Sequence, residues 1–158
     1  MEEIEAIIAA KNLLDNKMLV VKLSPEQATD KNLTGLIANQ LMSKYQRPVL
    51  LLNKRVSDVC GYESITWEGS GRNYDKSKFD DLRTFLQESQ LVLYAEGHAN
   101  AMGVGIADGT FDDFINYANT ALADYDFTPC YKVDFIFQGH NFNPNEIIDI
   151  ASLNSIWG

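Results

Sequence analysis

The hydrophobic and polar positions of the first fifty residues predict a strand, a helix and a second strand. Met18–Leu23 and Val49–Leu52 are short continuous apolar runs, which are typical of strands buried on both faces. Between them, Asp30 or Asn32 can cap a helix that is predicted to run to about Tyr45. Two such strands joined by a helix indicate a right-handed βαβ crossover with parallel strands.

Two amphipathic helices are predicted around the first strand. Residues 2–15 have apolar residues at helical spacing with the acidic residues first, which suits the helix dipole. The buried face of the helix that follows the first strand is predicted to carry four residues: Leu33, Leu36, Ile37 and Leu41.

The remainder of the chain predicts further strands and helices without internal repeats. Val59–Glu68 favours one or two antiparallel strands that run into a loop at Gly69–Asn73. The other predicted elements are a helix over residues 78–89, a helix tail or strand at Leu91–Ala95, a helix at Phe111–Ala123, a strand at Tyr131–Phe137 and a helix at Asn143–Leu153. The expected fold class is therefore α/β, with a mixed sheet, helices on both faces and a parallel βαβ unit at the start.

Composition and charge narrow the function classes. A chain of 158 residues with 46% hydrophobic and 22% charged residues is an ordinary globular domain. Its net charge of −9 argues against a protein that coats nucleic acid, because phosphate binding depends on Lys and Arg. However, residues 108–158 hold one base and eight acids, whereas residues 1–107 hold twelve bases and fourteen acids. The nearly neutral first two thirds leave room for a few well-placed donors.

The two cysteines and the apolar segments indicate the compartment. Cys60 and Cys130 do not form a disulfide framework, so we interpret them as thiols in a reducing compartment. The N-terminus is acidic where a signal peptide would be basic, and the apolar runs are too short to span a membrane. We expect no membrane association and a cytoplasmic location.

The first candidate site is Gly69-Ser70-Gly71-Arg72-Asn73, directly after a predicted strand. Glycines let the backbone approach a ligand and aim its N–H groups at an anion. Ser70 adds a hydroxyl group, and Arg72 has a forked donor that matches phosphate oxygens. By itself, this pattern favours a tight turn with a solvated arginine.

The second candidate site is the segment from Gly97 to Gly105, which contains His98, Ala99 and Asn100. Its small residues form a smooth surface for close approach, and His98 can donate to a phosphate. The alternative is a glycine-rich strand entry with a structural histidine, because a lone histidine is a weak signal for a metal site. The aromatic residues Tyr62, Trp67 and Tyr74 either stack nucleic-acid bases or pack under the first loop.

Motif spacing alone does not complete an active site. The sequence has no nucleophile elbow, P-loop, dinucleotide fingerprint or zinc spacing, and it has only two histidines. We therefore assign no catalytic residue and no metal ligand within this chain.

Three stretches, taken in order, resemble the DHH-associated domain of RecJ-type single-stranded-DNA exonucleases. The first runs from Leu33-Thr34-Gly35-Leu36-Ile37-Ala38 through Arg47-Pro48 to Val49–Leu52, like the family's Gly-Ile-Val-Ala helix, Arg-Pro and hydrophobic strand. The second, Gly69–Asn73, is similar to the family's Gly-Ser-x-Arg loop. The third, Gly97-His98-Ala99-Asn100-Ala101-Met102-Gly103, is similar to its Gly-Gly-His-x-x-Ala-x-Gly motif. Together they span roughly residues 18–123.

The resemblance implies a substrate-binding domain. In such enzymes a preceding DHH domain holds Mn²⁺ or Mg²⁺ and hydrolyses phosphodiesters, while the associated domain grips the nucleic-acid phosphates. Carried over to this chain, the phosphate-binding residues are Ser70, Gly71, Arg72, Asn73, Gly97, His98, Ala99 and Asn100. The implied partners are single-stranded DNA or a short oligonucleotide and a covalently preceding DHH domain.

The chain departs from the family at two points. Glu96 stands where the family has the first glycine of its third motif, and a carboxylate there would repel phosphate. An Asp-His-His triplet does not occur, so the catalytic half is missing. We interpret the chain as a fragment that is inactive alone, and we expect Mn or Mg in the parent enzyme but no cofactor here.

The resemblance also suggests a division of the chain. Residues 1–16 are expected to form a linker helix, residues 17–125 the DHH-associated domain, and residues 126–158 a strand–helix extension truncated before a further module. Two alternatives stay open: the substrate domain of an oligonucleotide or cyclic-dinucleotide phosphodiesterase, and a protein-interaction domain that kept the fold but lost the site.

Overall fold

The computed structural model describes residues 1–59, 61–131, 133, 136 and 143–152. Its strands are β1 (Leu19–Leu23), β2 (Val49–Val59), β3 (Tyr62–Arg72), β4 (Tyr94–His98) and β5 (Ala101–Ala107). Its α-helices are α1 (Glu2–Ala10), α2 (Lys31–Tyr45), α3 (Leu82–Glu88), α4 (Phe111–Ala121) and α5 (Pro144–Ser152). Short 3₁₀ turns lie at Leu13–Asp15, Pro25–Gln27 and Asp108–Thr110.

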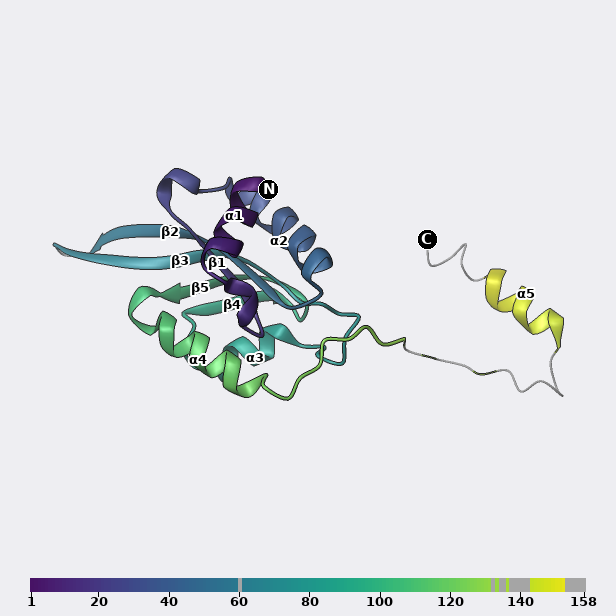
Figure 1. Cartoon of the computed structure of the whole chain (residues 1–158). Helices are drawn as coiled ribbons and strands as arrows, with labels where there is room; N and C mark the ends of the chain where they lie inside the picture. Colours follow the sequence, from purple (N-terminus) through teal and green to yellow (C-terminus); the bar gives the residue numbers. More distant parts are fainter. Residues whose placement is uncertain (60, 132, 134–135, 137–142, 153–158) are drawn as a thin grey trace.

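The five strands form one mixed sheet in the order β1-β2-β3-β5-β4. β1 and β2 are parallel and are joined by α2, whereas the other neighbouring pairs are antiparallel. Figure 1 shows α1 and α2 on one face of this sheet and α3 and α4 on the other. The predicted α/β class, the parallel βαβ start and the helices on both faces are confirmed.

Two hydrophobic clusters hold these layers together, because β1 and β2 are apolar on both faces. Under α1 and α2, the buried side chains of β1 and β2 are Leu19, Val21, Leu23, Val49 and Leu51. The alternate positions, Val20, Leu50 and Leu52, belong to the cluster under α3 and α4. Side chains alternate between the faces of a strand, so a continuous apolar run is needed where both faces are covered.

Helix α1 contributes to the first cluster through Ile4 and Ile8, which are both buried. The helix predicted over residues 2–15 ends at Ala10, because Asn12 adopts a left-handed conformation and a 3₁₀ turn follows. The segment expected to be a linker helix therefore packs on the sheet.

The buried face of α2 differs from the prediction. Leu33 and Leu36 are 48% and 57% exposed, whereas Thr34, Ala38 and Leu41 are buried. The predicted face was therefore wrong for Leu33 and Leu36. The predicted face and the observed face both have helical spacing. The way α2 lies on the sheet decides that the face with Thr34 is the buried one.

The Gly69–Asn73 segment also differs from the prediction of a loop. Its first four residues belong to β3, where they pair with β2 on one side and β5 on the other. Gly71 lies in β3, between β2 and β5. A β carbon at this position would lie 2.5 Å from Met102 Sδ. Glycine in a strand often marks close approach of a neighbouring group, and here that approach comes from the core.

The remaining predicted elements agree in kind but differ in their bounds. The helix predicted over 78–89 is α3, which begins at Leu82 after the Asp81 cap. At Leu91–Ala95, the end of the segment is strand, because β4 starts at Tyr94. The strand predicted at Tyr131–Phe137 falls largely outside the described residues, and Cys60 also lies outside them. Helix α5 matches the prediction at Asn143–Leu153 and has no buried residue.

The described part of the chain contains no helix that is both long and apolar enough to cross a bilayer.

Candidate functional site

The strand register brings the two candidate segments to one face of the sheet. Arg72 of β3 pairs with Ala101 of β5, and Ala101 pairs with His98 of β4. Because paired residues point to the same face and neighbouring strands lie about 4.8 Å apart, Arg72 and His98 flank β5 at roughly 10 Å. The two segments, which are about 25 residues apart in sequence, therefore form one surface.

Two residues further along the strands, the next set of paired residues on this face, called a register row here, adds Ser70 and Glu96. Ser70 pairs with Gly103, which pairs with Glu96 of β4. The Ser70 hydroxyl lies 2.9 Å from the Thr34 hydroxyl of α2, and either of these oxygens can donate. Thr34 therefore fixes Ser70 against the helix, at the border between the covered and open parts of this face.

Arg72 is seated against the backbone of α2. A β carbon at Gly35 would overlap Arg72 Nη2 and would lie 3.4 Å from Cζ and 3.5 Å from Ser70 Oγ. Nη1 of Arg72 donates to the carbonyl oxygen of Gly71 at 2.7 Å. Gly35 therefore provides the space in which the guanidinium lies.

Partial burial lowers the pKa of the Arg72 guanidinium, since desolvation disfavours the charged form. Arginine nevertheless stays charged at neutral pH. A cation that has lost part of its water attracts an anion more strongly than a fully solvated cation does. The position of Arg72 thus suits binding of a phosphate or carboxylate.

The turn next to His98 is held by the side chains and backbone N–H groups of Arg83 and Asn73, and the Asn73 N–H donates to the Asn100 carbonyl oxygen. Arg83 of α3 donates from Nη1 to the Gly97 carbonyl oxygen at 2.8 Å, and its backbone N–H donates to the Ala99 carbonyl oxygen. The Asn73 amide donates from Nδ2 to Asn100 Oδ1 at 2.9 Å and to the Phe79 carbonyl oxygen at 2.6 Å. These bonds fix the turn relative to the end of β3.

Gly97 itself has φ of +136°, which is a conformation that residues with a side chain rarely adopt. A β carbon there would also lie 2.7 Å from the Ala101 carbonyl oxygen. The glycine is therefore required by the hairpin geometry, whatever the residue binds.

The eight predicted phosphate-binding residues thus occupy different surroundings. Ser70 and Arg72 lie on the open face beside α2, and His98 is exposed at the end of β4 on that face. Gly71 lies over the core instead, and Asn73 is buried with its amide bound to the turn. Gly97 belongs to β4, where it pairs with Met102, and Ala99 and Asn100 form the turn. The binding role of all eight stays a prediction.

The structure adds Tyr94 and Glu68 to this face, and neither was among the site residues predicted from the sequence. Tyr94 of β4 and Glu68 of β3 pair with Gly105 of β5 from opposite sides. A β carbon at Gly105 would overlap Cε1 of Tyr94, so the ring lies directly on this glycine. Burial raises the pKa of Tyr94, and the charges of Glu68 and Glu96 raise it further. The signal in the sequence was the alternation of glycines in Gly103-Val104-Gly105, which leaves one face of β5 without side chains at these two positions.

A cavity of about 250 Å³ lies where these groups meet. Its polar walls come from Thr34, Asn53, Arg55, Glu68 and Ser70, and Tyr94 adds the aromatic wall. Asn53 is already engaged on both sides of its amide, because Oδ1 accepts from the Thr29 N–H and Nδ2 donates to the Thr29 carbonyl oxygen. The backbone of Gly69 and Gly103 completes the lining.

The aromatic residues that flank Gly69–Asn73 differ in their exposure. Trp67 and Tyr74 are buried, at 8% and 5% exposure, and so pack in the core as the alternative interpretation had it. The Trp67 indole N–H donates to Asp108 Oδ1 at 2.6 Å. Tyr62 is 80% exposed, next to the turn between β2 and β3.

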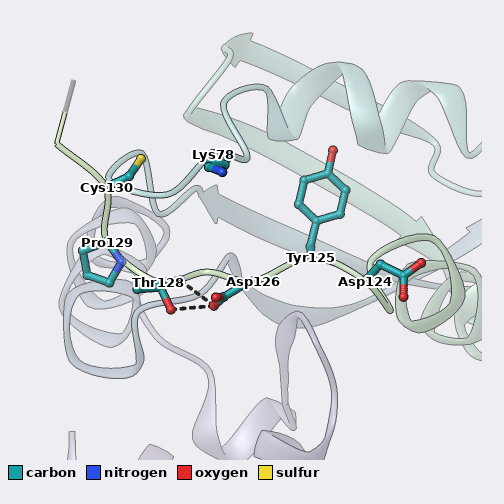
Figure 2. Close-up of a pocket in the computed structure, with 7 residues that line it drawn as sticks. All are labelled: Lys78, Asp124, Tyr125, Asp126, Thr128, Pro129 and Cys130. Carbon is teal, nitrogen blue, oxygen red and sulfur yellow. Dashed lines mark hydrogen bonds between the residues drawn. The ribbon is translucent and has the colours of Figure 1, made fainter. Parts of the chain in front are cut away.

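A larger cavity of about 500 Å³ lies away from this face. Lys78 and residues of the segment 124–130 line it, including Tyr125 and the half-buried Cys130 (Figure 2). The hydrogen bonds drawn in it join Asp126 to Thr128 within that segment. None of the predicted site residues lines this cavity, so its size alone does not make it the site.

Across the described residues, no group of three or more His, Cys, Asp or Glu side chains is placed to hold a metal ion.

Comparison with known proteins finds relatives that are similar to this chain in sequence. No family model matches the chain. The chain is 32% identical over 157 residues to YorK of Bacillus subtilis (strain 168), whose name describes an SPbeta prophage-derived single-strand DNA-specific exonuclease. The same identity holds for YorK of Bacillus phage SPbeta. Each match covers 99% of this chain and 26% of the relative, so the chain spans about a quarter of the length of these proteins.

Comparison with solved structures concerns the fold. RecJ of Thermus thermophilus in complex with Mg²⁺ aligns with 96% of this chain and 22% of its own, with a TM-score of 0.51 and 19% identity. The Mn²⁺ complex of RecJ from the same organism covers 96% of this chain and 21% of its own, with a TM-score of 0.51 and 17% identity. The likeness of this chain to RecJ-type single-stranded-DNA-specific exonucleases, which three motifs indicated, is therefore confirmed in sequence by YorK and in fold by RecJ.

Proposed function

We propose that this chain is the phosphate-gripping, single-stranded-DNA-binding part of a metal-dependent exonuclease, and that it works beside a separate DHH catalytic domain. One observation carries the proposal: Arg72, Ser70 and His98 share one open face of the sheet, with Arg72 seated on Gly35. The name of its relative YorK supports the same substrate class.

The geometry of this face suits a sugar–phosphate backbone. β5 presents Ala101 between Arg72 and His98, and Gly103 between Ser70 and Glu96, so a strand can approach the sheet closely. The guanidinium gives forked, charged hydrogen bonds to one phosphate. The imidazole of His98 then contacts a group about 10 Å away, across β5.

The overall charge sets the strength of this binding. With a net charge of −9, the chain repels DNA at long range, so we expect weak binding that depends on a few contacts. Each phosphate contact with a single strand contributes about 0.7 to the slope of log K against log salt. A small slope, of about 1 to 2 for this chain, is therefore expected.

The test is titration of a labelled, 5′-phosphorylated single strand at low salt by fluorescence anisotropy. Arg72→Ala removes a charged hydrogen bond and is expected to weaken binding about tenfold or more. It should also reduce the salt slope by about 0.7. Lys11→Ala is the matched control, because it removes the same charge at the end of α1, which packs near β1 at the opposite edge of the sheet from β4.

Two results would count against this assignment. Binding that survives Arg72→Ala unchanged would remove this arginine from the site. An equal loss with Lys11→Ala would show that net charge alone governs the interaction.

A second expectation concerns activity. The chain alone is expected to show no nuclease turnover with Mn²⁺ or Mg²⁺, since the proposal assigns the metals to the catalytic domain. Cleavage of a labelled single strand by the purified chain, with the activity abolished by chelation, would overturn this part of the proposal.

Glu96 favours a second candidate, a protein-interaction domain that kept the fold but lost the site. Its carboxylate lies in the same register row as Ser70 and one row from His98, where it opposes an incoming phosphate. Glu96→Gln should strengthen DNA binding if the face binds phosphates. No binding by either form would favour the interaction domain, while competition by a cyclic dinucleotide would point to the smaller substrate class.

A further inference from the structure

The cavity between α2 and Tyr94 begins beside the proposed phosphate site. Along β3, Ser70 and Glu68 precede Arg72 by two and four residues on the same face. At about 3.3 Å per residue, the middle of the cavity lies roughly 7 to 13 Å from the Arg72 position. This places the cavity within about one nucleotide of a phosphate held by Arg72.

The size of the cavity limits the occupant. Its volume of about 250 Å³ is below the range of about 300–1,000 Å³ that is usual for drug-sized ligands. The floor is backbone at Gly69 and Gly103, so a flat group can lie close to the sheet. One planar ring system fits these limits better than a dinucleotide does.

Tyr94 supplies a stacking surface. Its ring rests on Gly105 and also lines the cavity, so the sheet holds the ring in place while part of it faces the opening. Aromatic side chains fixed in this way are the usual platforms for bases of a single strand.

Glu68 supplies an acceptor at the opposite wall. Its Oε1 accepts from the Thr66 hydroxyl at 3.1 Å, which holds the side chain in position. A carboxylate has about four acceptor sites, so this bond leaves capacity for a further donor. The amino groups of cytosine and adenine are such donors, whereas thymine presents an oxygen at the same position as the cytosine amino group.

We propose that this cavity binds one nucleobase of the strand whose phosphate Arg72 holds, with Tyr94 stacking on the ring and Glu68 accepting from an exocyclic amino group. The site thereby prefers cytosine or adenine over thymine. The inference rests on the proposed function, which supplies the phosphate contact.

The experiment compares three 5′-phosphorylated single strands of equal length: oligo-dC, oligo-dT and an abasic strand. The expected order of affinity for the natural chain is oligo-dC, then oligo-dT, then the abasic strand. Tyr94→Leu is expected to weaken oligo-dC binding about tenfold, toward the abasic level, because the stacking surface is lost. Tyr94→Phe keeps the ring and is expected to retain the affinity.

Glu68→Leu tests the acceptor. Removing a negative charge strengthens the binding of every strand, so the informative quantity is the ratio of oligo-dC to oligo-dT affinity. That ratio is expected to fall to about one. Gly105→Ala is a second variant, because its β carbon displaces the Tyr94 ring without removing it, and it should reproduce the Tyr94→Leu result.

The outcomes separate the inference from the proposed function. If all three strands bind equally and Tyr94→Leu changes nothing, the phosphate site stands and the base site is wrong. If none of the three strands binds, the proposed function falls and the base site falls with it. Equal oligo-dC to oligo-dT ratios for the natural chain and Glu68→Leu would overturn the role of Glu68. Circular dichroism of each variant checks that it is folded.

Discussion

Arg72 of β3 lies against the backbone of Gly35 in α2, in space that any other residue at position 35 would fill. This relationship links the first and second motifs through two residues that are more than thirty positions apart in sequence. The glycine of the helix and the arginine of the strand therefore act as a unit: one provides the space and the other the charge.

Gly35→Ala is expected to separate binding from stability. Alanine in a helix interior is better than glycine by about 0.5–1 kcal/mol, so the free energy of unfolding should stay equal or rise. The added methyl group displaces the far end of Arg72, and single-strand binding should weaken about tenfold. Urea unfolding and fluorescence anisotropy measure the two effects.

Ser43→Ala on the exposed part of the same helix is the matched control, because it raises helix propensity without approaching Arg72. It should leave binding unchanged. A Gly35→Ala variant that binds as tightly as the natural chain would show that the seat of Arg72 has no part in binding.

Gly97→Ala is expected to destabilise the hairpin that carries His98. The positive φ of Gly97 costs about 1–3 kcal/mol for a residue with a side chain, and the new β carbon also meets the Ala101 carbonyl oxygen. Gly109→Ala should change the free energy of unfolding by less than about 0.5 kcal/mol, because a β carbon there meets nothing within 4 Å. Equal urea midpoints for the two variants would contradict the hairpin geometry.

Asp108 is expected to make stability depend on pH in the acid range. The Trp67 indole N–H, and then Lys22, lower the pKa of the Asp108 carboxyl from its ordinary value of 3.8. A lowered pKa in the folded state means that the stabilisation is fully present above 3.8 and is lost as the pH falls through the folded value. Urea midpoints measured from neutral pH downward follow this loss.

Asp108→Asn keeps an acceptor for the indole but does not titrate, so it isolates the charge. The natural chain should be more stable than this variant at neutral pH, and the difference should shrink below pH 3.8. Asp75→Asn, at an exposed position, is the control. If the gap between the natural chain and Asp108→Asn were constant down to low pH, the bond to Trp67 would not depend on the charge.

Several elements could be predicted from the sequence because their signals are local. The apolar runs that became β1 and β2, the Asp30 cap of α2 and the helical spacing of α4 each depend on neighbours within a few residues. The Asp30 side chain accepts from the Asn32 N–H at 2.8 Å, as a capping residue does. These features needed no knowledge of the sheet.

Other features were predicted wrongly, because the interactions that decide them come from outside the segment concerned. Gly69–Arg72 has the composition of a loop, yet pairing with β2 and β5 on both sides makes it a central strand. Likewise, Leu33 and Leu36 are apolar, but the side of α2 that meets the sheet carries Thr34 and Ala38. Strand propensity and helix periodicity are weak where tertiary pairing decides which residues are buried.

The sequence by itself determined the order of the elements, the parallel βαβ start and the presence of Ser70, Arg72 and His98 in recognisable motifs. Only the tertiary structure decided that these three residues share a face, that Gly35 makes room for Arg72, and that Tyr94 and Glu68 border a cavity beside them. The physical reason is register: one residue of slip between strands would turn any of these side chains to the opposite face. Register is set by the long-range packing of the whole sheet, which no short stretch of sequence contains.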